Sequence, residues 1–277
     1  MQKTFELSLT TQGPTYPPSE VMNENGDYVV IGRINREADN GKTVTDWGHA
    51  IVSPDSYTPD FGKQSPYEIV EEINYKDKSH NDMILCTLPL PLSNNNYPMV
   101  FAPEQLNDTN SIKRSSIPFH EITPPDTRRE DGLREMPPIT LGQWIKAKGN
   151  VTITVSPDKH HATFEFEFNE LIPDSLYTIM SLREWDLDPE KVTRPGPLGI
   201  PNVFITDTDG NGHFWAKLPN PFPSSDQSGR NRVINVILLW MSNRMSHGGA
   251  IGLHGLGGDV HAQLKMKGPS FFELETC

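Results

Sequence analysis

Three histidines at seven-residue intervals stand out toward the C-terminal end of the sequence. His247, His254 and His261 lie in a stretch that also holds six glycines. Imidazole nitrogens are common metal ligands, and glycine lets a backbone approach a bound ligand closely. A seven-residue interval aligns side chains only on a helix, however, which these glycines oppose. The stretch is therefore either a three-histidine metal site or, as we favour, a packed loop whose histidines bond to its backbone.

The segments on either side of this loop are predicted strands. Residues 233–241 form an apolar run typical of a buried strand, and residues 260–266 are its expected partner. Alternation places His261 on the same face as Gln263 and Lys265, and we expect that face to be solvated. If the loop encloses a ligand, Trp215 or Trp240 would form a wall of the cleft.

The segment DTDGNGHF contains a second group of possible metal ligands. Asp207, Asp209 and Asn211 place oxygen atoms at alternate positions before a glycine, as at the start of a calcium-binding loop. The closing glutamate of the helix-loop-helix version is absent, because Leu218 stands in its place. A β-hairpin turn explains the same residues and is the more frequent structure. The sequence thus predicts a hairpin turn, and in the alternative the same turn also binds calcium.

A third candidate lies in the segment DWGHA. Trp47 and His49 are two residues apart in a predicted strand, so both side chains leave the same face. His120 follows much later, in a short apolar segment next to a proline. Taken alone, the pair is an aromatic residue beside a histidine on a half-buried strand.

Trp-x-His followed by one distant histidine resembles the copper site of the methanotroph surface proteins of the MopE and CorA type. In that family a tryptophan is oxidised to kynurenine, which binds copper(I) together with two histidines. The resemblance implies Trp47, His49 and His120 as copper ligands, and imidazole suits copper(I). It also implies a secreted, periplasmic or cell-surface protein that acquires or stores copper, that accommodates calcium, and that is not an enzyme.

A different function uses the histidine loop instead. In that alternative the protein is a metal-dependent enzyme or a small-ligand-binding β-sandwich, with His247, His254 and His261 around the cleft. Substituting His254 would then abolish activity or metal uptake, whereas substituting His49 would not.

Composition narrows the partners that we expect. The 277 residues carry a net charge of −12, which disfavours nucleic acid because phosphate binding needs clustered Lys and Arg. No apolar run is long enough to span a bilayer, and the first residues lack an apolar signal core. Composition thus disfavours nucleic acid and a membrane span, while the candidate sites and the resemblance imply a metal ion as the partner and association at an outer surface.

The pattern of strands indicates the fold. Residues 150–155 and 162–168 alternate cleanly, the second with phenylalanines on one face and glutamates on the other. In the first half, strands are predicted at 27–34, 42–52 and 82–92, among long polar connections. The first two strands are joined by a turn with the sequence DNG.

One short helix is predicted from a capping box formed by Thr140 and Gln143. With strands at this spacing and no alternation of strands and helices, the sequence predicts an all-β fold, a loop-rich antiparallel β-sandwich with one short helix. We expect a single domain over residues 1–277. Its loop-rich N-terminal half, 1–136, would pack on a sandwich core, 137–277.

Overall fold

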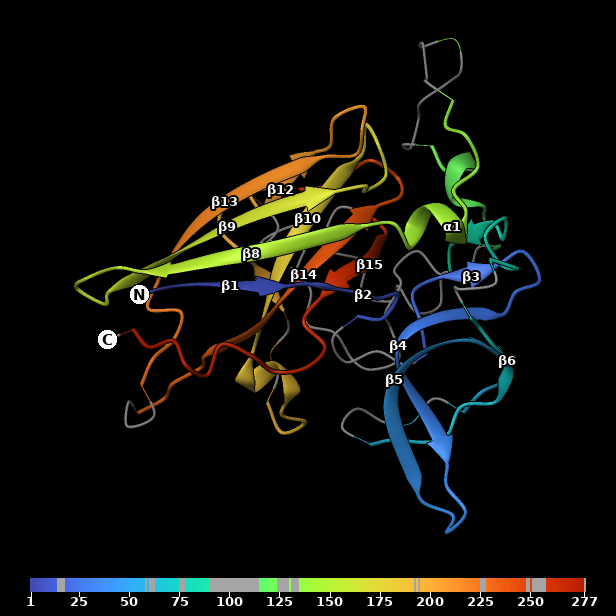
Figure 1. Cartoon of the computed structure of the whole chain (residues 1–277), viewed down its shortest axis with the longest axis horizontal. Helices are drawn as coiled ribbons and strands as arrows, with labels where there is room; N and C mark the ends of the chain where they lie inside the picture. The colour runs from blue at the N-terminus through green and yellow to red at the C-terminus, as the bar shows by residue number, and fades with distance from the viewer. Residues whose placement is uncertain are drawn as a thin grey trace.

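The protein is all-β, and its strands form three antiparallel sheets (Figure 1). A computed structural model describes residues 1–13, 18–57, 59, 63–74, 78–89, 115–123, 130, 135–191, 193, 195–224, 228–247, 250 and 258–276. The predicted sandwich class is confirmed, and α1 (Leu141–Trp144) is the α-helix of this part of the chain. No helix among these residues is long and apolar enough to cross a membrane.

Sheet A has the strand order β1-β8-β9-β13 and forms one layer of the sandwich. Its strands are β1 (Gln2–Glu6), β8 (Lys148–Val155), β9 (His161–Asn169) and β13 (Gly212–Pro219). Successive side chains point to opposite faces of a strand, so Phe164, Phe166 and Phe168 of β9 are buried while Glu165 and Glu167 are exposed. One face of sheet A therefore builds the core, and the other faces solvent.

Sheet B is the second layer and has the order β11-β10-β14-β15-β2, with β12 paired beside β10. Its strands are β2 (Ser8–Leu9), β10 (Leu176–Arg183), β11 (Gly196–Pro197), β12 (Val203–Ile205), β14 (Val233–Met241) and β15 (Val260–Lys265). Every residue of β14 and β15 is buried. A continuous apolar run such as β14 is typical of a strand that is covered on both faces.

Sheet C is built from the N-terminal half and lies beside the sandwich (blue and teal in Figure 1). Its order is β6-β5-β4-β3-β7, from β3 (Met22–Asn23), β4 (Tyr28–Glu37), β5 (Thr43–Val52), β6 (Ile69–Glu72) and β7 (Leu85–Cys86). The predicted turn between β4 and β5 is present, since Ala38 N–H donates to the Lys42 carbonyl at 2.9 Å and Gly41 has a φ of 73°. The strand expected over 82–92 is shorter, because β7 has only two residues and residues 90–92 lie outside the described part.

The helix α1 joins these parts through its tryptophan. As the capping box predicted, the Thr140 hydroxyl accepts a hydrogen bond from Gln143 N–H at 3.3 Å. Trp144 is fully buried, and its ring lies 5.8 Å from that of Phe119 and 6.1 Å from that of Trp240. A 3₁₀ helix, η1 (Phe119–Glu121), thus packs with α1 against β14.

The N-terminal segment contributes to both layers of the sandwich. β1 pairs with β8 in sheet A, and β2 pairs with β15 in sheet B. The N-terminal half therefore supplies strands of the sandwich itself, in addition to sheet C.

Candidate functional site

The Trp47–His49 pair lies on β5, where both side chains leave one face opposite Arg33 and Ile31 of β4. The ring of Trp47 faces two ammonium groups, because the Nζ atoms of Lys265 and Lys267 each lie 5.8 Å from its centroid. His49 is half-buried. Burial lowers its imidazole pKa and nearby Lys267 lowers it further, whereas Glu72 acts in the opposite direction.

His120 belongs to a different element from the Trp47–His49 pair. It lies in η1, where its Nε2 is 3.9 Å from the Glu121 carboxylate and its Nδ1 is buried without a hydrogen bond. The preceding residue, Phe119, packs against Trp144 and Trp240. Figure 1 shows η1 (green) beside α1, apart from the long hairpin of β4 and β5.

The structure places two of the three expected copper ligands on one strand face and the third in another element. Trp47 and His49 are together, but His120 is held by another element. The positive charge of Lys267 also lies close to both members of the pair, which disfavours a cation there. Copper coordination by Trp47, His49 and His120 stays a prediction.

His261 is a core residue, buried and bonded within the protein. Its exposed fraction is 1%, and its ring lies 4.5 Å from that of Phe119. Nδ1 lies 2.9 Å from the Glu20 carbonyl, and Nε2 lies 2.9 Å from the Ser242 hydroxyl. A carbonyl only accepts, so Nδ1 carries a proton. Both ring nitrogens are thus engaged within the protein.

The face of β15 that we expected to be solvated is buried, and that expectation was wrong. The N-terminal segment covers it: Lys265 Nζ donates to the carbonyls of Gln12 and Gly13 at 2.8 and 3.2 Å. A carboxyl oxygen of Glu20 accepts from Ala262 N–H at 2.6 Å. Burial raises the pKa of Glu20 to about 8 and lowers that of Lys265 to about 7.

The other members of the histidine loop are less defined by the structure. His247 is exposed, and its carbonyl accepts from Ala250 N–H at 2.9 Å. His254 lies outside the described residues. Trp240, one of the two expected cleft walls, is 1% exposed inside the core and cannot line a cleft. Within the described ranges, no three His, Cys, Asp or Glu side chains form a group that could hold a metal ion.

A tight turn is present at DTDGNG, but the predicted β-hairpin was wrong. The flanking strands β12 and β13 belong to different sheets, where they pair with β10 and β9. The Asp207 carboxylate accepts from the backbone N–H of Asp209 and Asn211 at 2.9 and 2.7 Å, and from the Asn211 amide at 3.0 Å. These bonds lower the pKa of Asp207. Gly210 has a φ of 76°, which the turn needs and glycine supplies. Both carboxylate oxygens of Asp207 thus hold the turn together, which accounts for the motif without calcium.

Trp215, the other expected cleft wall, lies at the surface. It sits on β13 between two outward side chains, His213 and Lys217, while Phe214 and Ala216 point into the core. Its exposed fraction is 54%, which is large for a tryptophan. Because β13 is the last strand of sheet A, its outer edge has no strand partner among the described strands.

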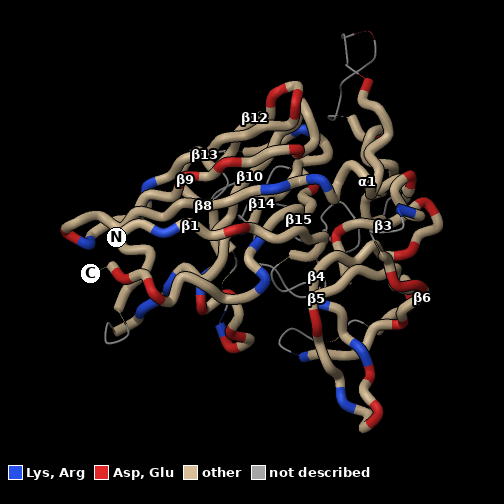
Figure 2. The backbone as a smooth tube through the Cα atoms, viewed as in Figure 1, with Lys and Arg blue, Asp and Glu red and all other residues tan. Residues whose placement is uncertain are grey.

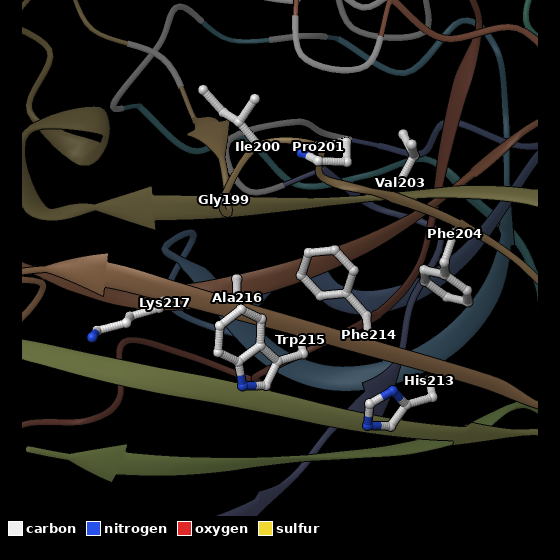
Figure 3. Close-up of a pocket in the computed structure, with 10 residues that line it drawn as sticks. All are labelled: Gly199, Ile200, Pro201, Val203, Phe204, His213, Phe214, Trp215, Ala216 and Lys217. Atoms are coloured by element: carbon white, nitrogen blue, oxygen red, sulfur yellow. The ribbon is translucent and has the colours of Figure 1, made fainter.

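A groove runs along this edge of β13, opposite residues 199–204 (Figure 3). Its volume is about 410 Å³. Glycines allow the two segments to approach: a Cβ at Gly199 would lie 2.8 Å from that of Ala216, and a Cβ at Gly212 would overlap the ring of Phe204. The groove lining is Gly199, Ile200, Pro201, Val203, Phe204, His213, Phe214, Trp215, Ala216 and Lys217.

The groove combines apolar surface with a few polar groups, which is typical of small-ligand sites. Ile200, 73% exposed, and Trp215 provide apolar surface, and the imidazole and ammonium of His213 and Lys217 provide polar contacts. The sequence analysis expected Trp215 beside a cleft at the histidine loop, whereas the groove that it borders is formed with segment 199–204. The available signal was the outward position of Trp215 in the β13 alternation.

Fold and groove together define an all-β sandwich with a surface site at the edge of one sheet. Comparisons with family models, curated proteins and solved structures gave no match for this chain. They therefore identify no family, including the copper-binding surface proteins that the Trp-x-His pattern resembles.

Proposed function

We propose that this protein is a ligand-binding β-sandwich that holds its ligand in the groove against Trp215. The observation that carries the proposal is the position of this indole. It is 54% exposed on an edge strand and borders a groove of about 410 Å³ that continues to an exposed Ile200. Binding a ligand would remove this apolar surface from water, which is favourable.

The groove chemistry selects a ligand with one flat apolar face and a polar rim. The indole offers a broad apolar surface and one N–H donor. His213 and Lys217 flank it at the next outward positions of β13. The unpaired edge of β13 adds backbone donors and acceptors, which bind polar groups of a ligand in place of water.

Saturation-transfer NMR with a panel of small neutral, aromatic and polyhydroxylated compounds tests this proposal. We expect signals from bound compounds in the wild type that disappear in Trp215→Ala. Trp185→Ala is the matched control, because Trp185 is a partly exposed tryptophan in the 3₁₀ helix η3 (Glu184–Leu187) and does not line the groove. A panel without binders, or binders that Trp215→Ala leaves unchanged, would refute the proposal.

Copper binding at Trp47 stays a prediction with its own test. It is favoured by one observation, the common face of Trp47 and His49 on β5. Metal analysis of the purified protein and mass spectrometry of the Trp47 peptide check it. Copper together with a kynurenine mass at Trp47 would support it, and an unmodified peptide without copper would exclude it.

A further inference from the structure

We propose that the ligand is a neutral oligosaccharide, which stacks one sugar ring on Trp215 and extends across the solvent-facing side of sheet A. This inference rests on the proposed function and names the ligand class of the same site. The evidence for an oligosaccharide is the set of side chains that the strand register places in line with Trp215.

The register places Trp215 at the end of a row that crosses all four strands. Trp215 is opposite Glu165 of β9, Glu165 is opposite Thr152 of β8, and Thr152 is opposite Thr4 of β1. Neighbouring strands lie about 4.8 Å apart, so the row extends roughly 14 Å. The Thr4 and Thr152 hydroxyls lie 2.8 Å apart at its far end and are exposed. This length suits a short chain of rings that begins on the indole.

The rows on either side supply uncharged hydrogen-bonding groups. Hydroxyl and amide side chains of this face are Gln2, Thr4, Asn150, Thr152, Thr154, Thr163 and Asn169. These groups both donate and accept, as sugar hydroxyls do. A sugar ring also has a face of C–H groups, which packs on an aromatic ring while its hydroxyls reach outward. The indole of Trp215 suits the C–H face of a sugar, and the neighbouring hydroxyl and amide side chains suit its hydroxyl groups.

Charge on this face does not favour an ionic polymer. Three carboxylates lie on this face, from Glu6 of β1 and Glu165 and Glu167 of β9, against the two ammonium groups of Lys148 and Lys217. Lys148 is itself paired with Glu170 at 3.1 Å. Figure 2 shows basic and acidic positions interspersed on these strands. A polyanion needs clustered cations, so a neutral chain is the better complement.

Isothermal titration calorimetry with neutral β-linked gluco-, xylo-, manno- and N-acetylglucosamine oligosaccharides tests the inference, using di-, tetra- and hexasaccharides on the whole chain. We expect at least one series to bind, with affinity rising with chain length. Trp215→Ala should weaken binding about tenfold or more, as expected for loss of a stacked aromatic surface. Thr152→Val keeps a β-branched shape but removes the hydroxyl, and it should weaken the longer chains several-fold and leave disaccharides unchanged.

The outcomes separate this inference from the proposed function. If no sugar binds but small compounds still depend on Trp215, the carbohydrate inference is overturned and the groove proposal stands. If a sugar binds equally well to Trp215→Ala, both are overturned. Equal affinity for all chain lengths, with no effect of Thr152→Val, would overturn the extended path across sheet A. Trp185→Ala again serves as the control that should bind like the wild type.

Discussion

Replacing His261 with alanine separates a structural histidine from a metal ligand. The imidazole is 1% exposed, and its two nitrogens are held by the Glu20 carbonyl and the Ser242 hydroxyl. It also packs on the rings of Phe119 and Trp240, at 4.5 and 5.8 Å. If these contacts are its role, His261→Ala destabilises the fold whether or not a metal is present.

The expected cost of His261→Ala follows from two effects. Removing a large buried side chain leaves a cavity and typically costs about 2–5 kcal/mol. The Glu20 carbonyl and the Ser242 hydroxyl also lose a partner, and each unsatisfied buried group costs about 1–3 kcal/mol before local rearrangement. We therefore expect a loss of about 4–6 kcal/mol, a large part of the roughly 5–15 kcal/mol that holds a typical domain folded.

Urea denaturation followed by tryptophan fluorescence measures this loss, with and without a chelator. In thermal unfolding of the same variants, we expect the melting temperature of His261→Ala to fall by about 10–20 °C. His213→Ala is the control, since His213 is exposed and surface changes usually stay within about 0.5 kcal/mol. A loss below about 1 kcal/mol would refute the structural role. The structural role would also be refuted if the chelator lowered the stability of the wild type as much as His261→Ala does.

Three further predictions test the interior and the turn. Because burial raises the pKa of Glu20 to about 8 from 4.5, the folded state retains a proton that the unfolded chain releases. Stability should therefore fall from pH 5 to pH 7 by up to about 1.4 kcal/mol per pH unit, and urea midpoints of Glu20→Gln should lack this slope. Lys265, with a pKa of about 7, acts in the opposite direction only above that window. Gly32→Ala should cost about 2–4 kcal/mol in the same assay, because Gly32 has a φ of 147° and a Cβ there overlaps the Gln12 amide. Asp207→Ala should lower the urea midpoint equally with and without added calcium, because the carboxylate holds the turn by hydrogen bonds. A calcium-dependent melting temperature in the wild type alone would favour the calcium alternative.

Much of the fold could be predicted, because its signals are local. The β9 alternation, the turn at Gly41 and the cap at Thr140 each depend on residues a few positions apart, and the structure shows all three. The strand predicted over 82–92 is represented only by β7. The apolar residues of this segment indicated burial, but burial alone does not determine how many of its residues pair with a neighbouring strand.

The candidate sites were harder to predict, because they depend on which distant segment covers a strand. Alternation correctly placed His261 and Lys265 on one face of β15, but nothing near them indicates that Glu20 and Gln12 close over that face. In the alternation of β13, Trp215 points outward and is 54% exposed. Local pattern thus gave the direction of each side chain, and long-range packing decided which became core.

The N-terminal segment that supplies β1 and β2 has a consequence for synthesis of the protein. Ser8 and Leu9 pair with Lys265 and Leu264, so residues that leave the ribosome early bond with residues that leave it late. Contacts of such high sequence separation slow folding. β10 pairs with one edge of β14, but until β15 emerges the other edge of this apolar strand is unpaired and accessible to other nascent chains. Expression yield should therefore depend on chaperone capacity and on translation speed through the last strand.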